Sequence, residues 1–163
     1  MDWTPLRYAL LNGYIDANQL LRTIELMIKL NDFMIYIVIV IVDMDTPLHY
    51  ASENGHIDAM QLLIDHGADV NKKGVMEWTP LHYASWKGHT NAMQILIVAD
   101  ADVNAKNNDG MAPLHYVSQN VHINAMQLLI DAGAYVNAKT KRGWTPLLYA
   151  SLNGDIDANQ LRI

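Results

Sequence analysis

The chain of 163 residues contains no cysteine, which excludes a disulfide scaffold and a thiolate metal site. Basic residues are also scarce: 11 Lys and Arg stand against 17 Asp and Glu, for a formal net charge of -6. Nucleic-acid binding needs clustered cations, and the one dense basic spot, Lys139, Lys141 and Arg142, is too small to predict it. We therefore expect no nucleic-acid partner.

The chain also lacks an apolar run long enough to cross a membrane. The longest apolar run extends only from Phe33 to Val42, whereas a spanning helix needs about twenty residues. The first residues, Met1 to Pro5, lack the charged and apolar regions of a secretory signal. We expect no membrane partner and a cytoplasmic location, with the nucleus or secretion as an effector left open.

What the chain does have is a repeated hexapeptide. The motif Thr-Pro-Leu-His-Tyr-Ala begins at Thr46 and returns, with substitutions and at a constant spacing, at Thr79, Ala112 and Thr145. A further copy begins at Thr4, separated from Thr46 by a longer interval. A constant spacing of about 33 residues is typical of a solenoid, in which each repeat packs on its neighbours.

Each repeat predicts two helices. Threonine caps free backbone N–H groups at a helix start, and proline is well tolerated at the first helical position. A glycine near the end of this first helix (Gly55, Gly88 or Gly154) predicts a left-handed helix end. A second stretch of helical apolar periodicity follows, such as Ile57 to Ile64, and then a polar loop that joins the next repeat.

These motifs resemble the ankyrin repeat. Its opening Thr-Pro-Leu-His-x-Ala, its Gly-His between helices and its Gly-Ala-Asp-Val-Asn are matched in the unit that begins at Thr46, the last of them by 67–71. The resemblance covers Thr46 to Leu161 well and Met1 to Leu21 adequately. It implies an all-α solenoid of stacked helix-turn-helix units with short β-hairpin loops. The expected units of this single array are an irregular 1–40, then 41–73, 74–106 and 107–139, and an incomplete 140–163.

Several positions depart from the pattern. Val121 stands where other copies have the helix-ending glycine, and a β-branched residue in the left-handed conformation costs roughly 1–2 kcal/mol. Asp100 replaces the glycine found at Gly67 and Gly133, and Ala112 replaces the capping threonine. Residues 22–45 form an atypical connector rich in Ile and Val, which we interpret as a decayed or inserted segment; a frameshifted stretch and a membrane-touching or partner-binding strand remain alternatives.

No residue pattern points to chemistry. Six of the seven histidines recur at the repeat period, and equivalent residues lie about 8–10 Å apart, too far to share one zinc ion. By resemblance, His49, His82 and His115 hydrogen-bond the loops between repeats. The repeated serines lack a unique base and orienting acid, and there is no glycine-rich phosphate loop. We predict no enzymatic activity, no metal and no cofactor.

The positions that vary between copies are the candidates for binding. By resemblance, partners contact the hairpin tips and the exposed side of the first helix. Trp86 is the preferred anchor, because water-facing tryptophan is often a hot spot, whereas hairpin packing could hide Trp78 and Trp144. A cage of Trp78 and Trp86 around a methylated lysine is not expected, because eight helical residues span about 12 Å. The predicted contact residues are Glu53, Val75, Met76, Trp78, Trp86, Lys87, Asn108, Asp109, Met111, Gln119, Lys141, Arg142, Trp144 and Leu152.

We therefore expect a monomeric, non-enzymatic interaction module that binds a partner protein through the concave face of the solenoid. Two alternatives remain open. The chain stops at Ile163, within the last expected helix, which fits a targeting fragment of a larger multidomain protein or enzyme. Val121 and residues 22–45 fit a decayed gene copy.

Overall fold

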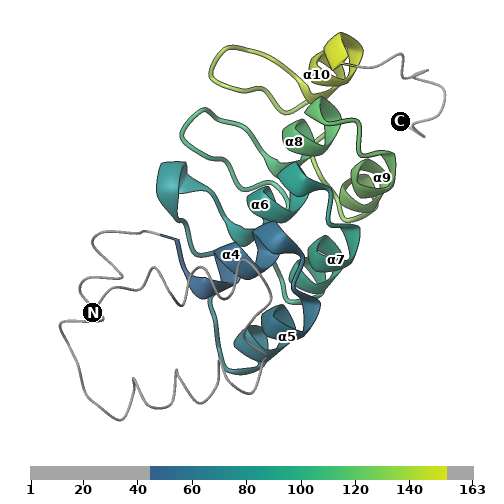
Figure 1. Ribbon diagram of the computed structural model, residues 1–163. Coiled ribbons are helices and arrows are strands. Elements are labelled where there is room, and N and C mark those ends of the chain that lie inside the picture. The colour runs from purple at the N-terminus through teal and green to yellow at the C-terminus, as the bar shows by residue number, and fades with distance from the viewer. Residues whose placement is uncertain (1–44, 154–163) are drawn as a thin grey trace.

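The computed structural model describes residues 45–153, which form a stack of helix pairs (Figure 1). The first helices of successive pairs are α4 (Pro47–Asn54), α6 (Pro80–Lys87), α8 (Pro113–Gln119) and α10 (Pro146–Asn153). The second helices are α5 (Ile57–Asp65), α7 (Thr90–Val98) and α9 (Ile123–Asp131). First helices pack on first helices in one row, and second helices pack on second helices in another. The predicted all-α solenoid is confirmed.

Each first helix of the three earlier pairs starts on a residue whose backbone N–H is held by the histidine three positions later. The Nδ1 atoms of His49, His82 and His115 accept these bonds at 2.9, 3.1 and 3.0 Å. Histidine therefore takes the place that Glu or Gln occupies in a capping box. Ala112 lacks the hydroxyl of the threonine found in the other copies, but its backbone N–H keeps the bond to His115. The start of α8 is therefore intact.

The helix ends confirm the predicted left-handed residues. Gly55 and Gly88 have φ of 66° and 72°, and Val121, at the equivalent position, has φ of 59°. A Cβ built on Gly88 would lie 2.6 Å from the His122 ring of the next repeat. Glycine at that position thus serves both the backbone conformation and the close stacking of repeats. Asp100 is also left-handed, with φ of 64°.

The core runs between the two rows of helices. Its largest fully buried side chains include Leu48, Leu81, Leu96 and Leu129, together with the predicted core methionines Met60, Met93 and Met126. Each repeat thus buries its apolar side against the next one, and stability follows from these interfaces.

The loops between repeats share one closing backbone bond and contain no strand within 45–153. The N–H of the first residue in each closed loop donates to the carbonyl four positions later, from Gly74 to Trp78 (2.7 Å), Asn107 to Met111 (3.0 Å) and Thr140 to Trp144 (3.0 Å). The first of these loops carries η1 (Val75–Glu77), a short 3₁₀ turn. The expected hairpins are therefore present as turns that lack a strand ladder.

The predicted unit 1–40, residues 22–44 of the atypical connector and residues 154–163 lie outside the described residues. Within 45–153, no helix is both long and apolar enough to cross a membrane.

Candidate protein-interaction surface

The three loops project to the same side of the stack, next to the row of first helices (Figure 1). We use the name inner surface for loops 72–78, 105–111 and 138–144 together with the exposed sides of α4, α6, α8 and α10. Most of the predicted contact residues lie on these elements.

Trp78 is the centre of an aromatic cluster on this surface. Its ring centroid lies 4.9 Å from that of Tyr83, 4.6 Å from that of Tyr116 and 5.9 Å from that of Trp86. The two indoles meet edge to face, with an interplanar angle of 86°. The expectation that the rise of one helix keeps the two tryptophans apart is wrong, because α6 begins only at Pro80 and Trp78 belongs to the loop before it.

Trp86 presents the exposed face of this cluster. Trp86 is 39% exposed, so a large part of an apolar indole faces the solvent. Lys87 Nζ lies 4.0 Å from the centroid of its ring and 3.6 Å from Glu53 Oε1 on α4. The Trp86 carbonyl accepts a bond of 2.8 Å from the side chain of Asn120 in the next repeat. Stacking and hydrogen bonding thus fix the position of Trp86.

Asp45 supports the loop on which Trp78 lies. Its Oδ1 accepts the Val75 N–H at 2.9 Å, and its Oδ2 accepts the Tyr83 hydroxyl at 2.7 Å. A Cβ on Gly74 would overlap the Asp45 carboxylate, so glycine is needed there for a close approach. Burial raises the pKa of Tyr83 well above its usual range, and its bond to Asp45 adds to this effect, so the hydroxyl stays a donor.

The two following loops are supported from within. Asn107 takes the position of Gly74 in its loop, accepts the N–H groups of Asp109 and Met111 at 3.0 and 2.9 Å, and donates to the Tyr116 hydroxyl at 2.7 Å. Thr140 Oγ1 accepts the Trp144 N–H at 3.1 Å. The missing side chain at Gly74 is therefore replaced in space by Asp45 from the preceding repeat.

Met111 is a correction to the predicted contact residues. The prediction that it is exposed is wrong, since it is only 9% exposed, and its sulfur accepts a contact of 3.9 Å from the Tyr149 hydroxyl. Trp144 packs on the same tyrosine, with centroids 5.2 Å apart, yet remains 37% exposed. Met111 is buried where Tyr149 of α10, in the next repeat, packs on it, and the repeat pattern alone does not reveal this contact.

The other predicted residues differ in exposure and position. Glu53, Trp78 and Gln119 are half-buried. The structure brings Glu53, Trp78, Trp86 and Lys87 together, while the rest are distributed along the inner surface. The exposed ones are Val75, Met76, Asn108, Asp109, Lys141, Arg142 and Leu152.

The buried histidines are structural, as expected from the resemblance. With Nδ1 accepting a backbone N–H, the ring proton lies on Nε2, which donates to loop carbonyls: His49 to Lys72 (2.9 Å), His82 to Met111 (3.1 Å) and His115 to Ala138 (3.2 Å). Burial lowers the pKa of His82 to about 4 and also lowers the pKa of His49 and of His115. In the described part of the chain, no three potential metal ligands come together.

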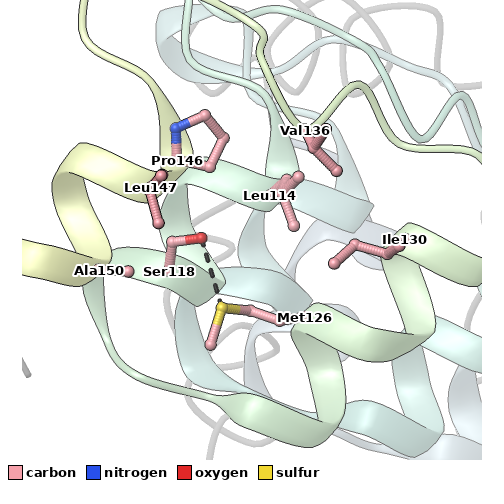
Figure 2. Close-up of a pocket in the computed structure, with 8 residues that line it drawn as sticks. All are labelled: Leu114, Ser118, Met126, Ile130, Val136, Pro146, Leu147 and Ala150. Carbon is pink, nitrogen blue, oxygen red and sulfur yellow. Dashed lines mark hydrogen bonds between the residues drawn. The ribbon is translucent and has the colours of Figure 1, made fainter. Parts of the chain in front are cut away.

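A small apolar cavity of about 20 Å³ lies between α8, α9 and α10 (Figure 2). Its polar lining atom is the Ser118 hydroxyl, which donates to the Met126 sulfur at 3.5 Å. A cavity of this size holds about one water, which would need two to four polar partners. It is therefore a packing defect between repeats and offers no ligand site.

Stacked helix pairs with projecting loops and a loop-bearing inner surface define a helical-repeat protein. A family model for ankyrin repeats, described as three copies, matches residues 24–107 and 91–161. The chain belongs to the ankyrin-repeat family. The matched range includes residues 24–44, which the sequence alone marks as atypical. No curated protein matches the chain.

Ankyrin repeats are in general protein–protein interaction modules, and the family is typically non-enzymatic. The buried histidines that recur in this chain fit that character, because each is engaged with backbone groups. Sequence reasoning found the basic residues Lys139, Lys141 and Arg142 but missed those of the two earlier loops, Lys72, Lys73 and Lys106. The signal was present in the sequence, since Lys73, Lys106 and Lys139 recur at the repeat period.

Proposed function

We propose that this protein is a non-enzymatic module that binds a partner protein through its inner surface, the concave face of the solenoid, with Trp86 at the centre. The unit 74–106 supplies the main contact, and the neighbouring loops extend it. The partner docks on a preformed surface, because loop closure and stacking already order the side chains involved.

The observation that carries this proposal is the exposed yet fixed indole of Trp86. Tryptophan is enriched among binding hot spots because it buries a large apolar area and has few rotatable bonds. Here the ring contacts Trp78 on one side and Lys87 on another. Binding a partner therefore costs little side-chain entropy at this residue.

The test is affinity capture from lysate of the source cells with three forms of the full chain: wild type, Trp86→Ala and Tyr135→Ala. Tyr135 is an aromatic control, since it is 67% exposed and lies after α9, outside the elements that make up the inner surface. We expect a protein that is retained by wild type and Tyr135→Ala and lost with Trp86→Ala, with an affinity loss of about 30-fold or more for a hot spot.

Circular dichroism melts of all three forms serve as the control for folding. A partner that folded Trp86→Ala retains at wild-type affinity contradicts the assignment of this surface. The double variant Trp86→Ala with Met76→Ala extends the test, because Met76 is 51% exposed on the adjoining loop.

A further inference from the structure

The charges of the solenoid are segregated, although the chain as a whole is acidic. Residues 45–153 contain seven Lys and Arg and ten Asp and Glu. Six of the seven cations lie in the three loops, which hold two acids, so the loops carry +6 - 2 = +4. The remaining described residues hold one cation and eight acids, +1 - 8 = -7. We name the six loop cations the basic ridge: Lys72, Lys73, Lys106, Lys139, Lys141 and Arg142.

The basic ridge is continuous from loop to loop. Lys73 Nζ donates to the Lys106 carbonyl at 3.3 Å, and Lys106 Nζ donates to the Lys139 carbonyl at 3.2 Å. Each of these two lysines therefore reaches the next loop, and the ammonium groups form a row that crosses the repeats.

Most of these charges have no acidic partner within the described residues. Lys73 pairs with Glu77 at 2.9 Å, and the other salt bridge of this part of the chain, Lys87 to Glu53, lies off the ridge. All six ridge side chains are exposed. Like charges gathered on one side of an acidic protein create a field that selects an oppositely charged partner.

We propose that the partner presents an extended acidic segment to the basic ridge; this inference rests on the proposed function and specifies the partner's chemistry. Helix-packing distances place equivalent positions of neighbouring loops about 8–10 Å apart, and an extended chain advances about 3.3 Å per residue. Carboxylates at every third residue therefore match successive loops, and about seven residues cover all three. Apolar residues of the same partner reach Trp86, next to the ridge.

A polypeptide fits this ridge better than a nucleic acid. Nucleic-acid duplexes carry a negative charge about every 1.7 Å. A duplex longer than the basic ridge would therefore face the rest of the protein, whose charges are mostly negative. Glu77 and Asp109 within the loops add local repulsion against a uniform polyanion. A segment with spaced carboxylates avoids both penalties.

The test is selection of random dodecapeptides, displayed on phage, with the immobilised full chain at about 0.1 M salt. We expect enrichment of Asp and Glu spaced by three residues. A synthetic peptide of the selected sequence should bind the Lys106→Gln/Lys139→Gln variant about fivefold more weakly than wild type. Its binding to wild type should weaken as salt is raised. Gln94→Ala, which changes an exposed side chain of α7 in the row of second helices, is the control and should retain the affinity.

The outcomes separate the two proposals. Loss of affinity with the ridge variant alone supports the acidic segment and contradicts the role of Trp86, whereas loss with Trp86→Ala alone does the reverse. No enrichment, or enriched peptides without acidic residues, overturns the ridge inference. A short single-stranded DNA that binds more tightly than the peptide, and loses affinity in the ridge variant, also overturns it. Melting curves of each variant establish that it is folded.

Discussion

Acidification from pH 7 to pH 5 is expected to destabilise the solenoid through His82, whose ring is fully buried. Its folded pKa is about 4, below the ordinary 6.5, mainly because burial disfavours the charged form. Protonation would also place a second N–H against the Thr79 N–H that Nδ1 now accepts. The unfolded chain therefore binds more protons than the folded one in this interval, and stability falls as the pH falls.

The magnitude follows from the two pKa values. At pH 7 the imidazole is mostly neutral in both states; at pH 5 it is mostly charged only in the unfolded state. Linkage gives a loss of about 2 kcal/mol in the free energy of unfolding from His82 alone between these pH values. His49 and His115 contribute in the same direction, since burial lowers the pKa of each.

The assay is urea unfolding followed by circular dichroism at pH 7, 6 and 5, for wild type and His82→Gln. Glutamine can still accept the capping N–H but does not titrate, so the variant is less stable at pH 7 yet loses less stability on acidification. Other titrating groups affect both proteins alike, and the difference between their slopes isolates His82. Equal slopes for the two proteins would refute the assignment of a buried neutral histidine.

Three further substitutions test the backbone and the loops. Val121→Gly should raise the free energy of unfolding by about 1 kcal/mol, because it relieves a left-handed β-branched residue. Gly88→Ala should lower the free energy of unfolding by more than about 1 kcal/mol, because the added Cβ meets the His122 ring. Thermal melts measure both effects, and an unchanged or lower melting temperature for Val121→Gly contradicts the first prediction. Asn107→Ala should cost about 2 kcal/mol or more, because it leaves the buried Tyr116 hydroxyl and two loop N–H groups without their partner. Amide hydrogen exchange of this variant should show faster exchange in loop 105–111 than in loop 138–144, and equal protection would count against the role of Asn107.

The fold could be predicted from the sequence because its determinants are local and repeated. The Thr-Pro start and the left-handed helix end are set by backbone chemistry within one helix. Val121 and Asp100 could be assigned by register even though neither is glycine, since the same geometry recurs from one repeat to the next. Each of these predictions needs no knowledge of side-chain packing between repeats.

The surface was less predictable because its side chains pack across repeats. Trp78 contacts Tyr116, which belongs to the next repeat. The equivalent pairs, Asp45 with Tyr83 and Met111 with Tyr149, also touch, but the sequence period does not show which positions of two neighbouring repeats meet. Met111 and Trp144 occupy equivalent positions, yet Met111 is buried against Tyr149 of the next repeat, whereas Trp144 is 37% exposed in the loop before α10, the last helix that the structure describes. Such outcomes follow from volumes and contacts in three dimensions.

The support of Gly74 by Asp45 limits how freely the repeats of this protein can be exchanged. A repeat is often treated as a portable unit that can be cut out, duplicated or reordered. The unit 74–106 cannot be moved in this way without its predecessor, because the carboxylate that accepts the Val75 N–H belongs to the repeat before it. In a shuffled array this unit would need either Asp at the position of residue 45 in the new neighbour or a side chain such as Asn restored at position 74.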